Sequence, residues 1–309
     1  MSAARVAVVA VTHGSSHVLP GWIEALERSG HRELLELVVV DSGSSPEEVE
    51  KMRAIAAGRV EAFVSLPNVG FGSGCNAGAG ATSAPTLLFT NPDCKICELP
   101  ARALAGEGLD GAIVGGHAIG SGRRLGFAKY PGFGEEAQEL ALGRYSRAFA
   151  RVEPGTEPAW VSGAALMVDR ADFERIGGFS PSFFMYFEDA DLCARHRLAG
   201  GNMRLDDELA VDHGSGKSTE PSRLHSIGYA LDSVNHYSGR VFAELHGSSW
   251  QRPALYLLLI PYALRRALVK LTRERDSLAQ LGGFFACLFS PRHALRRLGA
   301  KREDGTPWL

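Results

Sequence analysis

The chain has 309 residues, of which 45% are hydrophobic and 22% charged, a composition typical of a globular protein with one large or two modest domains. No apolar run reaches the ~20 residues that a membrane-spanning helix needs. The net charge of −2 is unevenly distributed, because residues 251–309 carry eleven Lys and Arg against four Asp and Glu, a net +7 that leaves −9 for the remainder. This split is typical of a basic tail that meets an anionic surface. Nucleic acid is not an expected partner, because the basic residues lack interleaved aromatic stacking motifs and the main domain is acidic.

The first ninety residues alternate between short apolar runs and segments with helical features. The apolar runs lack the polar alternation of a half-exposed strand, which is typical of strands buried on both faces of a parallel sheet. Ser45 and Pro46 indicate a helix start, since serine is a favoured N-cap and proline suits the first helical position. The alternation predicts an α/β fold with a mostly parallel, doubly wound sheet flanked by helices. We expect strands at 5–12, 34–40, 60–66 and 86–90, and helices at 20–28, 49–57 and within the Gly-rich stretch 68–80.

Polar residues follow these strands, at the edge of the sheet where doubly wound folds bind their ligands. They are Thr12-His13, Asp41, Asn68 and the turn Asn91-Pro92-Asp93. Asp93 is a hard oxygen donor, so the turn could bind a divalent cation that bridges to a diphosphate. The alternative is an ordinary Asn-Pro turn with a capping Asp.

The rest of the chain is less regular. A strand at 112–116 precedes a long loop over 117–158 with one short helix near 135–150, and loops of this length are usually functional or mobile. Apolar patches in the basic tail give it an amphipathic character that suits an anionic bilayer. The alternative for the tail is a helical pair packed on the main domain or forming a homodimer interface. Further strands are expected at 160–168 and 205–211, and helices at 170–176, from the acids near 188 through Leu198, and at 222–247.

The stretch 183–195, FFMYFEDADLCAR, joins five large apolar side chains to three acids. Aromatic rings supply buried area whereas carboxylates are seldom fully buried, so the junction suggests a wall of packed rings with acids at the rim of a cleft. One acid would then be a catalytic base. The alternative is the first turn of an ordinary helix, where acids favour the positive end of the helix dipole and Asp191 and Arg195 form a pair four residues apart.

Three short motifs have simpler explanations than the functions they suggest. Gly216-Lys217-Ser218 is not a P-loop, because Val211 stands where the pattern requires its first glycine. The stretch 72–77 matches the dinucleotide fingerprint G-x-G-x-x-A and leaves a Rossmann-type oxidoreductase open, but it follows the third strand, and close helix–sheet packing explains its small residues as well. Cys94 and Cys97 form a CxxC without the second pair or histidines of a zinc site. Five scattered cysteines and no visible signal peptide favour a reducing cytoplasm.

Several of these segments occur together in one characteristic order. They are DSGS at 41–44, PNVGFGSGCN at 67–76, TNPD at 90–93, GA at 163–164, GGF at 177–179, the stretch 183–195 and His213. The set resembles the family 2 glycosyltransferases, inverting enzymes of GT-A fold, and within them the rhamnosyltransferase-like branch that builds bacterial cell-surface polysaccharides. The resemblance covers about residues 5–245. It implies a GT-A catalytic domain at 1–250, with a nucleotide-sugar half at 1–116 and an acceptor half at 159–250, before the tail 251–309.

The resemblance also implies roles for individual residues. Asp189 matches the catalytic base, and Glu188 is the adjoining acid that positions it or contacts the sugar. Asp93 takes the place of the last Asp of the D-x-D metal motif, whose first Asp is Asn91 here, and His213 matches a histidine that completes the metal shell. Arg195 either supports the leaving diphosphate or pairs with Asp191. The expected nucleotide-sugar residues are Thr12, Asp41 and Asn68 at the base and ribose, Asn76 near the diphosphate, and Gly70, Asn91 and Arg195.

These matches imply an inverting glycosyltransferase with a divalent metal, Mn²⁺ or Mg²⁺, as its cofactor. Such a reaction needs a base on the acceptor hydroxyl and positive charge at the leaving diphosphate. The expected donor is a nucleotide-diphosphate sugar, first dTDP-L-rhamnose, with another sugar from a UDP-sugar as the alternative. The expected acceptor is a saccharide or a polyprenyl-diphosphate-linked saccharide. The expected location is cytoplasmic, peripheral on the inner face of the membrane.

Overall fold

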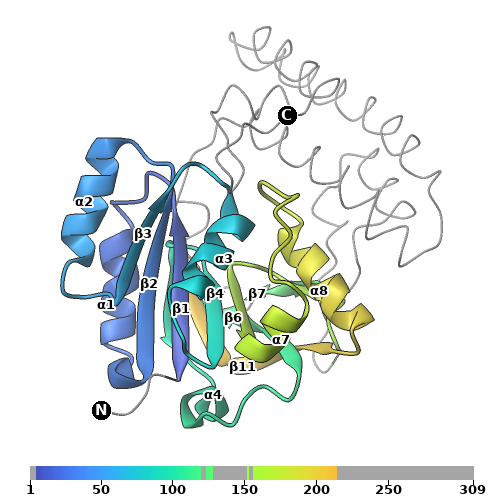
Figure 1. Ribbon diagram of the computed structural model, residues 1–309. Helices are drawn as coiled ribbons and strands as arrows, with labels where there is room; N and C mark the ends of the chain where they lie inside the picture. Colours follow the sequence, from blue (N-terminus) through green and yellow to red (C-terminus); the bar gives the residue numbers. More distant parts are fainter. Residues whose placement is uncertain (1–4, 120–122, 128–151, 153–155, 214–309) are drawn as a thin grey trace, which may run out of the picture.

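The computed structural model describes residues 5–119, 123–127, 152 and 156–213 (Figure 1). The predicted helices at 135–150 and 222–247 and the tail 251–309 lie outside this part of the chain. The strands are β1 (Val6–Thr12), β2 (Leu35–Ser42), β3 (Ala62–Leu66), β4 (Thr86–Thr90), β5 (Cys94–Glu98), β6 (Ala112–Ala118), β7 (Arg123–Arg124), β8 (Gly126–Phe127), β9 (Trp160–Val161), β10 (Ala165–Asp169) and β11 (Asn202–His213). The helices are α1 (Leu19–Glu27), the 3-10 turn η1 (Arg32–Leu34), α2 (Pro46–Ala56), α3 (Phe71–Gly80), α4 (Ala101–Ala105), α7 (Arg170–Arg175) and α8 (Glu188–Leu198).

The first half of the central sheet is the predicted parallel part, with the strand order β3-β2-β1-β4. In its register Thr12 of β1 lies directly beside Asp41 of β2. All seven residues of β1 are buried, because α1 and α2 cover one face of the sheet and α3 covers the other (Figure 1). The predicted helix start is confirmed, since Ser45 accepts a hydrogen bond from Glu48 N and Pro46 opens α2.

The second half of the sheet mixes parallel and antiparallel pairs, and its order continues from β4 as β10-β6-β11-β5. β10 runs antiparallel to both β4 and β6. The prediction of one strand over 160–168 is wrong, because the chain bends at 162–164 between β9, which pairs with β8, and β10. β5 and α4 were not predicted. β5 follows β4 after a three-residue turn, yet it ends the sheet on the far side and packs against α1, so the sheet curls around that helix.

Hydrophobic clusters fill both sides of the sheet and fix the end of β4. On the side of α3, α7 and α8, the ring of Phe89 lies 5.1 Å from that of Phe173 and 5.2 Å from that of Phe179, centroid to centroid. Tilted and edge-to-face ring pairs of this kind add to the free energy of area burial. On the opposite side, Trp22 is fully buried and its Nε1 donates to Thr90 Oγ1 over 3.0 Å. The turn that follows β4 therefore starts from a rigid position.

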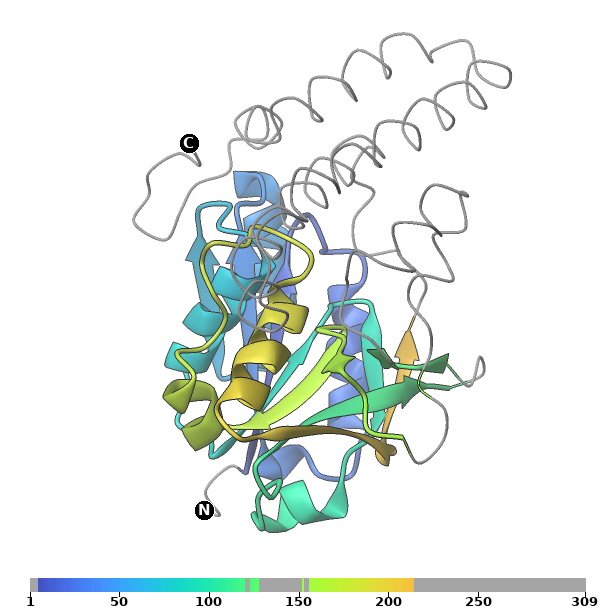
Figure 2. The same ribbon diagram turned by 90° about the vertical axis from the view of Figure 1, so that its right-hand side faces the viewer.

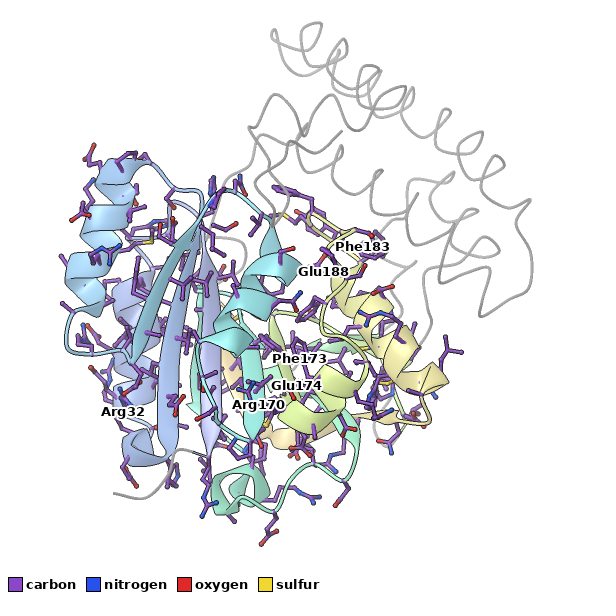
Figure 3. The ribbon with its side chains drawn as sticks, viewed as in Figure 1. Arg32, Arg170, Phe173, Glu174, Phe183 and Glu188 are labelled. Carbon is purple, nitrogen blue, oxygen red and sulfur yellow. The ribbon has the colours of Figure 1, made fainter. Side chains whose placement is uncertain are left out.

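Arg170 of α7 holds the C-terminal end of α3, as seen where the two helices meet (Figure 3). Its Nη1 donates to Ala79 O over 3.1 Å, and its Nε donates to Ala84 O over 2.8 Å. The last carbonyls of a helix have no partner within the helix and carry partial negative charge, so a cation suits this position. The contact fixes α3 at the end opposite to its glycine-rich start.

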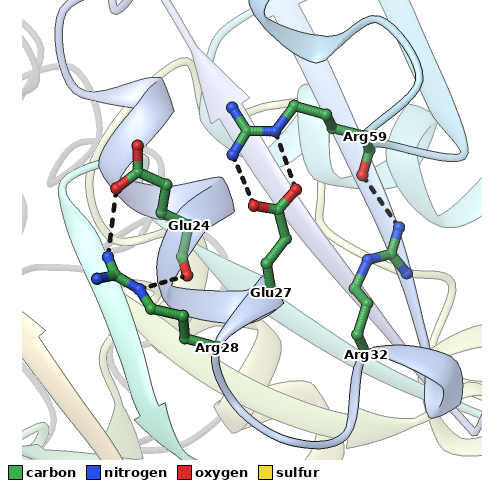
Figure 4. Close-up of polar contacts among 5 residues, drawn as sticks. All are labelled: Glu24, Glu27, Arg28, Arg32 and Arg59. Atoms are coloured by element: carbon green, nitrogen blue, oxygen red, sulfur yellow. Dashed lines mark hydrogen bonds and ion pairs between the residues drawn. The ribbon is translucent and has the colours of Figure 1, made fainter.

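Ion pairs gather at the amino-terminal edge of β2 and β3 (Figure 4). Arg59 Nη2 lies 2.6 Å from Glu27 Oε2, Arg32 Nη2 donates to Arg59 O over 3.0 Å, and Arg28 Nη2 lies 3.2 Å from Glu24 Oε2. These side chains are partly or largely exposed, and exposed pairs contribute only ~0.2–1 kcal/mol each. The ion pairs at this edge contribute to stability. The polar residues that suit a ligand lie at the opposite edge of the sheet, where β1, β2 and β3 end.

Candidate active site

Three of the predicted nucleotide-binding residues meet at the carboxyl ends of β1 to β3. Thr12 is buried and its Oγ1 donates to Val40 O over 3.2 Å. Asp41 is also buried, and its carboxylate accepts hydrogen bonds from Ser44 N, at 3.3 Å, and from the hydroxyls of Ser44 and Ser65. Three polar groups thus fix the Asp41 carboxylate in place at the sheet edge, as a preorganised acceptor requires.

Asn68 joins this group through the loop that follows β2. Ser42 Oγ lies 3.5 Å from Asn68 Oδ1, and it also accepts a hydrogen bond from Val69 N over 3.1 Å. Gly43 has φ +77°, and a Cβ there would lie 2.5 Å from the backbone N of Asn68, so only glycine permits the contact. The loops after β2 and β3 are therefore packed directly on each other.

Gly70 connects the nucleotide half to the aromatic and acidic stretch. Its φ is +85°, and a Cβ would lie 2.0 Å from Phe184 O, which no other residue could accommodate. The next residue, Phe71, donates its backbone N–H to the same Phe184 O over 3.1 Å. The start of α3 and the loop before α8 therefore form one contact surface, although 113 positions separate Phe71 from Phe184.

The predicted aromatic wall is only partly correct. Phe183, Phe184 and Phe187 are buried in the core, whereas Tyr186 is 40% exposed. Tyr186 and Phe187 have φ values of 72° and 66°, in the left-handed region that side chains of this size seldom adopt. α8 begins directly after this pair, at Glu188.

Asp189 is held by two backbone N–H groups. Gly163 N donates to its Oδ2 over 2.9 Å, and Ala190 N donates to its Oδ1 over 2.8 Å. Burial raises the pKa of Asp189 to about 6, and these hydrogen bonds act in the opposite direction by favouring the charged form. The result is a carboxylate with a fixed orientation and a pKa close to neutral, as a general base requires.

Glu188 differs from its neighbour in exposure and in its partners. It is 5% exposed and lies against Gly72 in the first turn of α3, where a Cβ would be 3.4 Å from Glu188 Cβ. Its Oε2 has no hydrogen-bond partner among the described residues. Burial and then the charge of Asp189 raise the pKa of Glu188 to about 8. Of the two adjacent acids, Glu188 is therefore the one whose pKa lies further above its ordinary value.

The predicted metal residues lie where the chain leaves β4 for β5. Asp93 is 7% exposed, and its negative charge adds to burial in raising the pKa of Cys94. The backbone of His213 pairs with Cys94, one position from Asp93, while the His213 side chain lies outside the described structure. Asn91 N donates to Ala164 O over 3.4 Å. Within the described residues no group of three or more His, Cys, Asp or Glu side chains could hold a metal ion.

This donor set fits a divalent cation only when a ligand shares it. A buried carboxylate and one histidine on a paired strand leave most positions of a Mn²⁺ or Mg²⁺ ion for water and phosphate oxygens. Such a set is typical of cations that bind together with substrate phosphates, since a dedicated protein cage would need more carboxylates. The residues present therefore suit a cation that arrives with a diphosphate.

Two of the predicted nucleotide-binding residues have other partners. Asn76 Nδ2 donates to Phe179 O over 2.8 Å, and Asn76 Oδ1 accepts from Phe179 N over 2.9 Å, so its carboxamide ties α3 to the loop before α8. Arg195 Nε donates to Asp191 Oδ2 over 2.8 Å, and its Nη1 donates to Ile176 O over 2.6 Å. The pairing alternative for Arg195 and Asp191 is confirmed.

The glycines of the stretch 72–77 pack α3 onto the sheet. A Cβ on Gly74 would lie 2.7 Å from Val11 Cγ1, and a Cβ on Gly78 would lie 2.3 Å from Val9 Cγ1. Small residues here allow the helix to approach β1 closely, as the packing explanation of this stretch requires. They give no support to the oxidoreductase alternative.

The loop 162–164 belongs to the candidate site, although the sequence patterns predicted no role for it. Gly163 N binds the Asp189 carboxylate, and the next residue, Ala164, binds Asn91 through its carbonyl. A Cβ on Gly163 would lie 3.0 Å from Phe71 Cε1. One short loop therefore contacts the candidate base, the candidate metal turn and the start of α3. The only signal in the sequence was the Gly-Ala pair of the ordered set.

Comparisons with known protein families match both halves of the described structure. Residues 7–98 match the family described as Glycosyl transferase family 2, and residues 143–212 match the N-terminal domain of galactosyltransferase. The first segment contains the polar strand ends of the parallel half. The second contains Gly163 and the Glu188–Asp189 pair.

Two similar proteins are rhamnosyltransferases by name. N-acetylglucosaminyl-diphospho-decaprenol L-rhamnosyltransferase of Mycobacterium tuberculosis is 33% identical over 129 residues, which are 41% of this chain and 40% of that protein. Rhamnosyltransferase WbbL of Escherichia coli (strain K12) is 49% identical over 41 residues, 13% of this chain and 16% of that protein. The matched part of the chain thus spans two fifths or less of the length of these relatives.

A solved structure with a similar fold is the mannosyltransferase PcManGT from Pyrobaculum calidifontis in complex with GDP-Man and Mn²⁺. The TM-score is 0.50 at 15% sequence identity, over 94% of this chain and 86% of that chain. At this identity the likeness concerns the fold alone. It confirms the predicted GT-A fold.

Proposed function

We propose that the chain, whose residues 7–98 match glycosyl transferase family 2, transfers a sugar with inversion from a nucleotide-diphosphate sugar to a hydroxyl of a saccharide or polyprenyl-diphosphate-linked acceptor. The observation that carries the proposal is the Asp189 carboxylate, fixed by Gly163 and Ala190 where the two halves of the sheet meet. The names of the two relatives favour dTDP-L-rhamnose as the donor. Transfer of another sugar from a UDP-sugar is the alternative.

The donor lies, in this proposal, across the carboxyl ends of β1 to β4. Thr12, Asp41 and Asn68 hold the nucleotide base and ribose, which is supported by their direct packing on one another. Gly70 and Asn91 shape the backbone on either side of the sugar diphosphate. Asn76 and Arg195 act indirectly by fixing α3 and α8, because their polar atoms already bind protein groups.

Asp189 is the general base of the proposed reaction. It accepts the proton of the acceptor hydroxyl as that oxygen attacks the anomeric carbon on the face opposite to the departing diphosphate, and this single displacement inverts the configuration. Glu188 carries its own proton at neutral pH, because two adjacent charged carboxylates in a buried site would repel each other. This difference between the pKa values of Glu188 and Asp189 keeps Asp189 ionised, so it can accept a proton.

Asp93 and His213 would hold the divalent cation, Mn²⁺ or Mg²⁺. When bound, such an ion supplies positive charge at the leaving diphosphate oxygens. Asp93 offers the hard oxygen ligand, and the pairing of β5 with β11 brings the backbone of His213 next to it. Ala164 O fixes the turn from its other side through Asn91 N.

The deciding experiment uses the full chain with dTDP-L-rhamnose, MnCl₂ and N-acetylglucosaminyl diphosphate carrying a long alkyl chain. We expect a product larger by one deoxyhexose in the mass spectrum, with the anomeric configuration inverted relative to the donor by NMR. UDP-glucose, UDP-galactose and GDP-mannose serve as matched donors for the alternative. Retention of configuration, or no transfer from any of the four donors, would overturn the proposal.

Membrane contact is proposed only for the tail. Among the described residues, no helix combines the length and apolar character that crossing a bilayer demands. Residues 251–309 follow the proposed catalytic domain 1–250 and lie outside the described part. Their net charge of +7 and apolar patches support a peripheral contact with an anionic bilayer, which would bring the enzyme to a lipid-linked acceptor. A homodimer interface is the alternative.

A further inference from the structure

Tyr186 is the one side chain of the run 183–187 that is both aromatic and exposed. The three phenylalanines of the run are 1%, 2% and 7% exposed, whereas Tyr186 is 40% exposed. The ring therefore contributes little to the core that its neighbours build.

The backbone at Tyr186 is held in an unfavourable conformation. Its φ of 72° lies in the left-handed region, and the same is true of Phe187 next to it. Such residues cost of order 1–3 kcal/mol each and persist only where the surroundings fix them. Asparagine or glycine would adopt this conformation with less strain. The presence of tyrosine here is explained if its ring serves a purpose other than folding.

Both ends of the strained turn are anchored. Before it, Phe184 O accepts the N–H of Phe71, and Gly70 is pressed beneath the same carbonyl. After it, Phe187 O accepts Asp191 N over 2.9 Å, which starts the hydrogen bonding of α8. Tyr186 is thus carried on a rigid arch between two fixed points, and its position does not depend on a ligand to order it.

The arch lies close to the candidate base. Asp189 is three residues after Tyr186, so the two Cα atoms can be no more than about 10–11 Å apart, even for a fully extended chain. At this separation the Tyr186 ring comes within reach of an acceptor sugar whose hydroxyl contacts Asp189. Aromatic rings present a large apolar face that suits the C–H face of a pyranose, and tyrosine adds a polar tip at the wet edge.

We propose that Tyr186 is an acceptor-binding residue whose ring stacks on the sugar that carries the attacking hydroxyl. This inference rests on the proposed function and adds the contact by which the acceptor is recognised. The sequence predicted a wall of five residues. In this proposal Phe183, Phe184 and Phe187 are buried and support the turn, and Tyr186 contacts the acceptor.

The test compares Tyr186→Ala, Tyr186→Asn and Tyr186→Phe in the full chain, with alkyl-linked N-acetylglucosaminyl diphosphate as the acceptor. We expect Ala and Asn to raise the acceptor KM about tenfold, as the loss of one good aromatic contact would. Phe should keep the acceptor KM within about twofold, because the stacking face remains. The donor KM of the Asn variant should equal that of the wild type, and its melting temperature should be no lower, since Asn adopts the left-handed region with less strain.

Leu198→Ala is the matched control, because Leu198 is 54% exposed at the opposite end of α8 and should leave the acceptor KM unchanged. An acceptor KM unchanged in the Ala and Asn variants overturns the inference. So does a fall of melting temperature and donor affinity together, which would assign Tyr186 to folding. If the wild type transfers no sugar, the proposed function itself fails, whereas an active wild type with insensitive Tyr186 variants refutes this inference alone.

Discussion

Gly163 donates its backbone N–H to Oδ2 of Asp189 over 2.9 Å, and the adjacent Ala164 accepts a hydrogen bond from Asn91. Two consecutive residues of one bend thus contact the candidate base and the turn that carries the candidate metal ligand Asp93. Reactions between a bound donor and an activated acceptor depend on such mutual positioning, because displacements of about 1 Å can cost a hundredfold in rate. The bend 162–164 therefore sets the geometry between the two halves of the site.

Replacing Gly163 tests this relationship. In Gly163→Ala the new Cβ would lie 3.0 Å from Phe71 Cε1 and 3.7 Å from Asp189 Cβ, so the ring or the bend must move by a few tenths of an ångström. We expect kcat to fall about tenfold or more. The acidic limb of the pH–rate profile should move to higher pH, because the hydrogen bond from Gly163 favours ionised Asp189. The double variant Gly163→Ala with Phe71→Leu should regain part of the lost rate, because the smaller side chain at position 71 leaves space for the new methyl group.

Gly80→Ala is the control for the Gly163 variant, since no atom lies within 4 Å of the added methyl group. It should leave both kcat and the pH profile unchanged. An unaltered pH profile in Gly163→Ala would show that the bend does not orient the base.

Asp189→Asn should keep donor binding and lose turnover. The amide has nearly the shape of the carboxylate but cannot accept the proton, and a general base contributes typically ~10²–10⁴-fold to a rate. Calorimetric titration of dTDP-L-rhamnose with MnCl₂ should give the wild-type Kd, while kcat falls by about that factor. Asp110→Asn, at an exposed acid beside Arg102, is the matched control. A kcat within a few-fold of wild type would exclude Asp189 as the base.

Glu188→Gln should change how stability depends on pH. Burial raises the pKa of Glu188 to about 8 in the folded protein, above its ordinary value of 4.5, so the folded state binds the proton more tightly than the unfolded chain does. The wild type therefore loses stability as pH rises from about 4.5 to 8. Glutamine cannot ionise, so the variant should not show this loss. The difference in free energy of unfolding, variant minus wild type, should therefore be at least ~1.4 kcal/mol larger at pH 9 than at pH 5, which is the equivalent of one pKa unit.

Urea unfolding of both proteins at the two pH values measures this difference. Glu107→Gln, at an exposed position, should run parallel to the wild type. Parallel curves for Glu188→Gln as well would mean that Glu188 is ionised in the folded protein at neutral pH.

Asp93→Asn should weaken the binding of the divalent cation. EDTA should abolish transfer in the wild type, and Mn²⁺ or Mg²⁺ should restore it, because an ion held by Asp93 and His213 would supply positive charge at the leaving diphosphate. Titration of Mn²⁺ by electron paramagnetic resonance in the presence of dTDP should give a Kd at least tenfold weaker for Asp93→Asn, a result independent of activity. Full activity in chelator would remove Asp93 and His213 from the mechanism.

Reversal of three charges in the tail tests the proposed membrane contact. Each Lys or Arg near an anionic bilayer contributes ~1 kcal/mol, so Arg265→Glu, Arg266→Glu and Lys270→Glu together should weaken binding to phosphatidylserine vesicles about a hundredfold. Sedimentation with vesicles measures the partition. Arg28→Glu, on the exposed end of α1, is the control. Unchanged vesicle binding, or a change in oligomeric state instead, would favour the interface alternative for the tail.

Local sequence patterns predicted the parallel half of the fold and the position of its ligand edge. Buried runs indicate strands because a strand covered on both faces needs apolar residues throughout, and polar residues directly after such a run must lie at its carboxyl end. Thr12 and Asp41 were placed correctly by this argument alone. Ser45 and Pro46 were sufficient to define the start of α2 for a similar, local reason. The ordered set of motifs indicated the GT-A fold, which the structure confirms.

Only the tertiary structure decided how the acids and rings of the stretch 183–195 divide their tasks. Glu188 and Asp189 are adjacent acids in the sequence, and their difference arises from Gly163, 26 residues earlier, whose N–H reaches one carboxylate and not the other. Tyr186 differs from its neighbours because the arch before α8 turns its ring out of the core. Periodicity records which face of a segment is buried, whereas these contacts depend on how loops from distant segments pack, and that information is not contained in any local pattern.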